Sequence, residues 1–117
     1  MNVVVLQGKV SREPVERELP SGSVVVSYEV TTRDDENRAR TVPVSWFDPG
    51  ARAPVVDEGD DVTVVGQVAR RFWRAGAATN SRTEVVASAV LPSRRKQAVR
   101  RAVEEAVAEL GPLIDAD

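Results

Sequence analysis

The chain has 117 residues, of which 42% are hydrophobic, so it can close the core of one ordinary domain but not of two. Sixteen Lys and Arg against eighteen Asp and Glu give a formal charge of −2, which excludes a uniformly basic nucleic-acid coat and confines any polyanion site to a local patch. The chain has no Cys and no His, which excludes disulfides, thiolate or imidazole metal sites, Cys nucleophiles and Ser-His-Asp triads.

Runs and alternations of apolar residues predict five strands in the first 92 residues. The predicted strands are residues 3–10, 23–31, 42–47, 61–71 and 83–91. Gly8 suggests a bulge or tight bend in the first strand, and Gly66 is expected to let the fourth strand coil. Pro43 has no backbone N–H, so the third strand is expected to lie at an edge or to carry a bulge there.

The polar segments between these strands are expected to be turns and loops. Leu19 to Gly22 is a turn signal, and Arg33 to Arg40 reads as a solvated hairpin loop. Asp48 to Gly59 contains several prolines and glycines, so it can hold at most one short helical turn. Arg74 to Arg82 is rich in Gly, Ala, Ser and Asn and predicts a second long flexible loop.

The end of the chain predicts an amphipathic helix over residues 93–110. Pro92-Ser93 supplies a stop and cap signal before it, and Gly111-Pro112 ends it. The apolar stripe of this helix consists of Val99, Val103, Ala106, Val107 and Leu110. A helix with such a narrow stripe can pack on its own barrel, pair with a symmetry mate or bind a partner protein, and packing on its own chain is the simplest outcome.

The charges of this last segment are divided between its two ends. Its basic residues come first and its acidic residues follow. They are Arg94, Arg95, Lys96, Arg100 and Arg101, then Glu104, Glu105, Glu109, Asp115 and Asp117. Cations at the start of a helix oppose its macrodipole, so helix stability does not account for this order. A solvated face is the default interpretation, contacts elsewhere are the alternative, and residues 111–117 are expected to form a short acidic tail.

Five evenly spaced strands with polar hairpin loops and a short insert between the third and fourth predict an all-β fold. The expected architecture is a five-stranded Greek-key barrel of the OB type over residues 1–92, followed by the C-terminal α-helix. An SH3-like barrel and an open sandwich are the competing architectures.

Residues 2–91 resemble the bacterial single-stranded DNA-binding proteins, an OB-fold family, in the order and spacing of several short motifs. The matching residues are Leu6, Gly8 and Val10, then Pro14 and Arg17, Pro20-Ser21-Gly22, Gly66-Gln67-Val68, Arg71-Phe72-Trp73 and Thr83-Glu84-Val85-Val86. No single motif is specific, but their joint order indicates the family fold and favours its activity. The last helix and the tail lie outside this resemblance.

Binding of single strands without sequence readout requires aromatic faces for the bases and cations for the phosphates. Trp46 falls on the same side of its strand as neighbouring valines and is interpreted as a core residue, whereas Phe47 falls on the opposite side. Trp73 lies among arginines at the mouth of the 74–82 loop. The resemblance implies that Phe47 and Trp73 stack on bases. For Trp73 the alternatives are a cap over the barrel end or an oligomer contact.

Two further tryptophans usual in the family are missing here. One would fall within Arg33 to Arg40, which has no aromatic residue, and the other aligns with Thr41. Their loss predicts weaker or differently routed binding. Arg33, Arg38 and Arg40 are candidates for compensating phosphate contacts, although neighbouring acidic residues offset their charge. An exposed loop of mixed charge is the simpler interpretation.

Seven cations are predicted to form a basic track around Trp73 if the barrel brings the first, fourth and fifth strands side by side. These residues are Lys9, Arg12, Arg17, Arg70, Arg71, Arg74 and Arg82. For each residue taken alone, an isolated solvated charge is an equally good interpretation.

No catalytic, metal or cofactor site is predicted. The acidic cluster at residues 57–61 lacks the ordered spacing of a calcium loop and reads as a polar turn. No phosphate-cradling glycine motif occurs, so the chain is interpreted as a non-enzyme. No apolar run approaches the roughly 18 residues of a membrane span, and Gln7 and Lys9 interrupt the first ten residues where a signal peptide would be apolar. We therefore expect a cytoplasmic protein.

Two functional hypotheses remain at this point. The first is sequence-independent single-stranded DNA binding in bacterial replication, recombination or repair, and the resemblance implies a homotetramer or dimer. The family commonly ends in an acidic, Pro-Phe-containing tip that recruits partner enzymes, whereas this chain ends in Leu113 to Asp117, which puts recruitment by that route in doubt. The second hypothesis is a protein-interaction or assembly module that has lost most DNA binding, with the terminal helix as the docking element.

Overall fold

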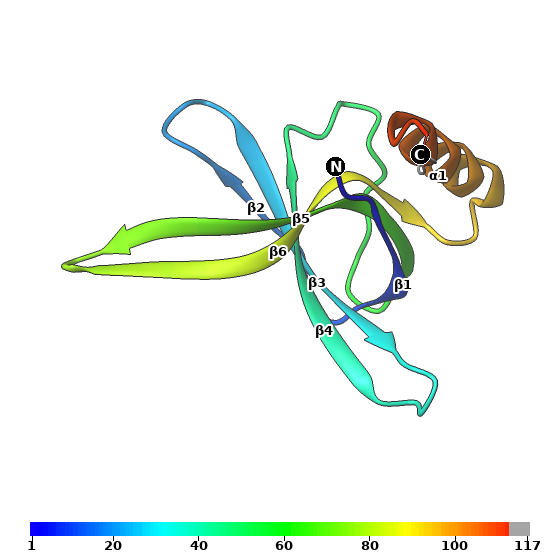
Figure 1. Ribbon diagram of the computed structural model, residues 1–117, viewed down its shortest axis with the longest axis horizontal. Helices are drawn as coiled ribbons and strands as arrows, with labels where there is room; N and C mark the ends of the chain where they lie inside the picture. Colours follow the sequence, from blue (N-terminus) through cyan, green and yellow to red (C-terminus); the bar gives the residue numbers. More distant parts are fainter. Residues whose placement is uncertain (113–117) are drawn as a thin grey trace, which may run out of the picture.

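The computed structural model describes residues 1–112, whose arrangement is shown in Figure 1. Its strands are β1 (Val4–Val10), β2 (Val15–Glu18), β3 (Val24–Arg33), β4 (Ala39–Phe47), β5 (Asp61–Ala75) and β6 (Ala78–Pro92). The helix α1 covers Lys96–Glu109. Most of the predicted acidic tail, from residue 113 on, lies outside the described residues.

Five of the strands close into a barrel. The pairing order is β1-β5-β6-β4-β3, and a pairing between β1 and β3 completes the ring. β4 and β6 run parallel, and the other pairs run antiparallel. This is the Greek-key arrangement of an OB barrel. The predicted fold class, a five-stranded OB barrel with an added C-terminal helix, is therefore confirmed.

The short strand β2 has no counterpart in the sequence prediction. Its four residues are all exposed, and it pairs only with the outer edge of β3, from Val15 opposite Ser27 to Glu18 opposite Val24. A strand that buries neither face shows no apolar alternation. Residues 15–18 therefore form a strand because they hydrogen-bond to the edge of β3, and not because of their own residue pattern.

The prediction of a long flexible loop over residues 74–82 is wrong. β5 and β6 stay paired as far as Ala75 opposite Ala78, and the connection between them is only Gly76 and Ala77. Gly76 has a φ of 65°, which a glycine adopts without strain at the first position of a two-residue hairpin turn. The small polar residues of this segment thus belong to a hairpin, which projects from the barrel to the left in Figure 1.

The barrel interior consists mainly of valine side chains. The buried cluster is Val10, Tyr28, Val30, Val44, Val56, Val62, Val64, Val85, Ala87 and Val90. Trp46 packs against this cluster, as the alternation of β4 predicts. β4 pairs with β6 only at Val44 and Ser45, so Pro43 lies just outside that pairing, in the edge-like position that its missing N–H requires.

Because of Tyr28 in this cluster, the stability of the barrel should fall at alkaline pH. Burial, together with the charge of Glu16, raises the pKa of the Tyr28 phenol from 10.0 to about 12. The folded state therefore favours the neutral phenol, and this stabilisation is complete below pH 10.0 and is lost as the pH rises from there through about 12. We expect the denaturation midpoint of the wild type to fall over this range. Tyr28→Phe should lack that component, and an identical pH profile in the two proteins would contradict the assignment.

α1 packs against β5 and β6, but not in the way that the sequence predicts. Ser93 does not cap the helix, because its hydroxyl hydrogen-bonds that of Thr63 at 2.9 Å and the helix begins at Lys96. Val107 does not belong to the packed stripe, since it is 49% exposed, whereas Ala102 and Ala106 face the barrel and line a small cavity there. Within residues 1–112 no helix is long and apolar enough to cross a membrane.

Candidate nucleic-acid interface

The projecting β5–β6 hairpin carries two exposed aromatic residues on opposite faces. Trp73 lies opposite Asn80, and Phe72 lies opposite Ser81. Because successive strand residues point to opposite sides, one face contains Trp73 with Arg71 and Arg82, and the other contains Phe72 with Arg70 and Arg74. Trp73 is 43% exposed and Phe72 is 63% exposed, so both rings are accessible to a ligand.

A guanidinium group supports the ring of Trp73 from within the hairpin. The Arg71 guanidinium carbon lies 5.9 Å from the centroid of the indole, within the range of a cation–π contact. The Nε of Arg71 also lies 3.6 Å from Oε2 of Glu84, and a terminal nitrogen of Arg82 lies 3.9 Å from Oε1 of the same carboxylate. One carboxylate thus holds both arginines of the Trp73 face.

Glu84 links this face to the barrel. Its side chain is only 1% exposed, and the Ser45 hydroxyl on β4 donates a hydrogen bond of 2.9 Å to Oε1. A buried carboxylate is costly unless it is paired and hydrogen-bonded, and here both conditions are met. The result is a chain of contacts that runs from Ser45 through Glu84 and Arg71 to Trp73. We refer to these four residues as the Glu84 network.

Phe47 lies on the same side of the sheet as this network. Ser45 and Phe47 are two positions apart on β4, so they share a face, and Ser45 is in direct contact with Glu84. The strand registers place Phe47 and Trp73 eight positions apart along β6, or about 26 Å, on either side of the Ser45–Glu84 contact. Phe47 is half-buried and lies opposite Val25, which lies opposite Arg17 on β2. Phe47, Trp73, Arg71 and Arg17 therefore share one face.

The opposite face of the hairpin holds the remaining predicted arginines. Arg70 lies with its guanidinium carbon 5.8 Å from the centroid of Phe72 and donates a hydrogen bond to the Ser81 hydroxyl at 3.0 Å. The exposure of Phe72 on this opposite face was not predicted from the sequence. The available signal was its own strand alternation, because a residue next to Trp73 on an exposed strand must present its ring to the other side.

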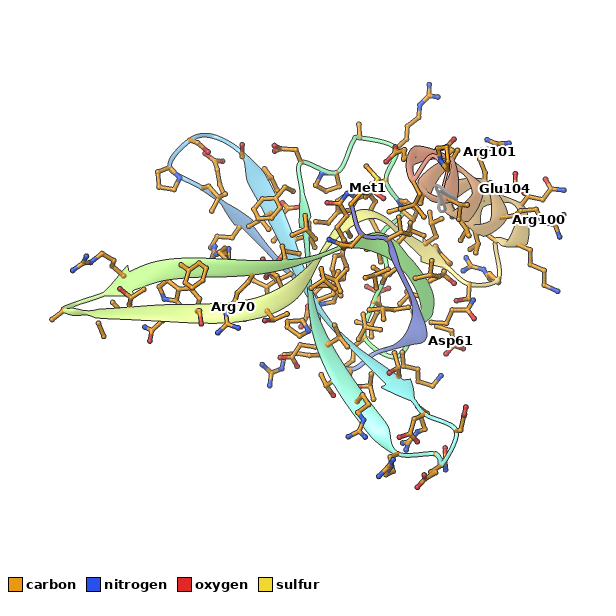
Figure 2. The ribbon with its side chains drawn as sticks, in the orientation of Figure 1. Met1, Asp61, Arg70, Arg100, Arg101 and Glu104 are labelled. Atoms are coloured by element: carbon orange, nitrogen blue, oxygen red, sulfur yellow. The ribbon has the colours of Figure 1, made fainter. Side chains whose placement is uncertain are left out.

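The seven cations of the predicted basic track do not form one continuous track. β1 does pair with β5, but Lys9 lies opposite Asp61 and contacts its carboxylate at 2.9 Å, at the other end of β5 from the hairpin arginines. Figure 2 shows Asp61 on the barrel and Arg70 on the projecting hairpin, to either side of the crossing strands. Arg12 lies 3.5 Å from the Glu29 carboxylate, also on the barrel. The barrel pairs the expected strands, but the cations lie at different positions along them.

Arg33 and Arg40 lie at the tip of the β3–β4 hairpin, separate from the Glu84 network. Arg40 lies 3.6 Å from Asp34, and Arg33 donates a hydrogen bond to the Asn37 carbonyl oxygen at 2.9 Å. The backbone N–H of Arg38, followed by further hydrogen bonds from its side chain and from Glu36, lowers the pKa of Asp34 and keeps it ionised. The arginine at position 40 is therefore partly neutralised, as the mixed charge of this loop predicts.

Two of the acidic residues in the 57–61 cluster make local contacts. Asp60 accepts a hydrogen bond from the backbone N–H of Asp57 at 2.9 Å, and Asp61 pairs with Lys9. A pocket of about 520 Å³ lies beside this segment, with Tyr28 and Trp46 in its wall and carboxylates such as Glu16 at its rim. Negative charge at this rim repels phosphates. The Trp73 face is therefore the better candidate for nucleic acid.

We expect Glu84→Gln to free the Arg71 guanidinium while a side chain of the same size still fills the position of Glu84. The amide keeps a partner for Ser45 but cannot form the ion pairs, so Trp73 should emit at longer wavelength and with lower anisotropy in a Trp46→Phe background. The salt dependence of DNA binding should also become steeper, because Arg71 and Arg82 are no longer neutralised. Glu29→Gln, which removes the carboxylate beside Arg12, is the matched control for the emission measurement and should leave Trp73 emission unchanged. Unchanged Trp73 emission in Glu84→Gln would refute the network.

Comparison with known proteins agrees with this geometry. The model of the single-strand binding protein family matches residues 1–93, which is most of the chain and ends before α1. A search of curated proteins finds no match. The members of this family bind DNA and are not enzymes, so the match supports single-stranded DNA binding in general and a non-enzymatic role. The chain belongs to the single-strand binding protein family.

Proposed function

We propose that this protein binds single-stranded DNA without reading its sequence, by stacking bases on Trp73 and Phe47 and by holding phosphates with cations on this face and at other positions on the barrel and its hairpins. The proposed phosphate contacts are Lys9, Arg12, Arg17, Arg33, Arg40, Arg70, Arg71 and Arg74. The observation that carries the proposal is the Trp73 face, where an exposed indole, its supporting guanidinium and Phe47 share one side of the sheet.

The strength of binding follows from the number of stacking positions. Each base stacked on an aromatic ring contributes about 1 to 3 kcal/mol, and this face offers two such rings. Two family stacking positions are absent at residues 33–41, and several cations are already paired with carboxylates. Binding by one copy is therefore modest. A homotetramer or a dimer, which we propose as the working form, multiplies these contacts.

The cellular role that we propose is protection of single strands during bacterial replication, recombination or repair, in the cytoplasm. Stacking and phosphate contacts tolerate any base, which suits a protein that covers transient single strands regardless of sequence. An assembly module that has lost DNA binding is the second candidate. It is favoured by the net charge of −2 and by the missing aromatic positions.

Titration with oligothymidylate separates these two functions. Trp73 fluorescence should be quenched on binding, with Trp46 in the barrel as a constant background, and the logarithm of the binding constant should fall linearly with the logarithm of salt concentration. Oligodeoxycytidylate should bind similarly, and duplex DNA more weakly. No binding at low salt would overturn the proposal in favour of the assembly module.

A further inference from the structure

A second group of cations lies outside the family match, at the start of α1 and in the turn before it. These residues, here called the α1 basic cluster, are Arg94, Arg95, Lys96, Arg100 and Arg101. All five are exposed, and among residues 1–112 none of them lies within 4.0 Å of a carboxylate. In this they differ from Lys9, Arg12 and Arg71, each of which has an acidic partner.

Helix stability does not explain this cluster. The first turn of α1 contains no acidic residue, and its N-cap, Arg95, makes no side-chain cap hydrogen bond. Cations at this end oppose the helix macrodipole and are unfavourable for the helix itself. Glu104 and Glu105 stand four residues after Arg100 and Arg101, in the weaker order for such pairs, and within residues 1–112 no ion pair forms between them. The positive charge remains directed to solvent.

The solvent-facing side of the first half of α1 carries basic residues and no exposed apolar residue. Ala98, Val99 and Ala102 are half-buried, while Gln97 is exposed among the basic residues. A protein partner needs a buried apolar centre with aromatic or aliphatic anchors. A nucleic-acid backbone needs only cations, and arginine suits phosphate especially well. Charge complementarity therefore favours the phosphates of a single strand over a protein surface.

The cluster and the hairpin lie on different sides of the barrel. The backbone N–H of Ser93, just before the cluster, donates to the Asp61 carbonyl oxygen at 3.0 Å, and Lys9 pairs with the Asp61 side chain at 2.9 Å. Lys9 thus belongs with the start of α1 and not with the hairpin. Figure 2 shows Arg100 and Arg101 on the outer side of α1, across the barrel from Arg70. A strand must pass over the barrel to reach both groups.

We propose that the α1 basic cluster is a second phosphate-binding surface, which holds the backbone of a single strand beyond the part bound at the hairpin. This inference rests on the proposed DNA binding and adds a segment that the family match does not include. Short strands should occupy the Trp73 face alone, and longer strands should engage both surfaces. The cluster contributes electrostatic affinity and no base preference, because it has no ring on which a base can stack.

The test combines a triple variant, Arg94→Gln, Arg100→Gln and Arg101→Gln, with oligothymidylates of two lengths. For an oligonucleotide of about 30 nucleotides, the slope of log binding constant against log salt should become shallower by about 2, because each lost phosphate contact removes about 0.7. For one of about 8 nucleotides, within the site size of a single OB barrel, slope and Trp73 quenching should match the wild type. Arg52→Gln, a single exposed cation in the 48–60 segment, is the control and should leave both unchanged.

The possible results separate this inference from the proposed function. If the salt slope of the triple variant with the long oligonucleotide equals that of the wild type, the second phosphate-binding surface is refuted. Quenching of Trp73 in the same titration would still support the proposed function. Absence of quenching and binding in the wild type overturns both. If the triple variant keeps its DNA slope but loses binding to polyglutamate, the cluster binds an acidic protein and the inference is wrong. Circular dichroism and thermal melting establish that the variant retains its fold.

Discussion

Gly66→Ala is expected to destabilise the barrel by about 3 kcal/mol, near the upper end of the usual cost of overpacking. A Cβ at this position would meet the carbonyl oxygen of Val86 and would lie 2.8 Å from the Cα of Ala87, both in the backbone of β6. Gly66 also follows the bulge that shifts the register between β5 and β6. Neither strand can move away without losing its pairing. Urea denaturation of the purified variant measures the loss.

Gly50→Ala is the matched control for this prediction. Gly50 has no heavy atom within 4 Å of a built Cβ, so alanine should change the free energy of unfolding by only a few tenths of a kcal/mol. Gly8→Ala should behave like Gly66→Ala, since its Cβ would meet the backbone carbonyl of Thr31. Equal denaturation midpoints for Gly66→Ala and Gly50→Ala would show that the two strands do not approach as closely as described.

Trp73→Ala is expected to weaken binding of oligothymidylate by about 5- to 150-fold, the equivalent of one stacked base at about 1 to 3 kcal/mol. The substitution removes a ring and no charge, so the salt slope should stay near that of the wild type. Fluorescence anisotropy of a labelled oligonucleotide measures both quantities, because the variant lacks its own reporter. Stability should change little, since Trp73 is 43% exposed on a projecting hairpin.

Phe72→Ala supplies the comparison on the same hairpin. Phe72 has a similar guanidinium partner and is exposed on the opposite face, so its loss should affect binding less than the loss of Trp73. If Phe72→Ala weakens binding more than Trp73→Ala does, the DNA lies on the Phe72 face. The assignment of the interface to the Glu84 network and Phe47 is then incorrect.

The barrel strands were predictable because their core-facing residues are apolar and occur in alternation or in short runs. Val44 and Trp46 alternate with Ser45 and Phe47, and such alternation is visible in the sequence. The hairpin beyond Arg70 and the strand β2 bury neither face, so their residues carry no alternation signal. Their structure depends on the register of a neighbouring strand, which a local pattern does not contain. The capping prediction at Ser93 failed for a related reason, since a tertiary hydrogen bond to Thr63 takes its hydroxyl.

Only the part of the candidate site that is formed by residues close in sequence was predictable. Trp73 and Arg71 are close in sequence, and the structure brings them into contact. Ser45 and Glu84 are 39 positions apart, so their contact depends on barrel closure. The sequence also does not show that Glu84 is buried, because glutamate is normally a surface residue. The predicted basic track was wrong although the expected strands do pair. Lys9 meets the start of β5, whereas Arg70, Arg71 and Arg74 lie at its other end.

The parallel contact between β4 and β6 has a consequence for how ligand and fold depend on each other. The backbone pairing of these strands is limited to Val44 opposite Val85 and Ser45 opposite Val86, and the Ser45–Glu84 hydrogen bond lies beside this narrow seam. Any ligand that prefers the ordered Trp73 face also stabilises the closed seam, by mass action. Amide hydrogen exchange at Val44 and Val85 should therefore slow when oligothymidylate is added, because binding at the Trp73 face and closure of the barrel belong to the same equilibrium.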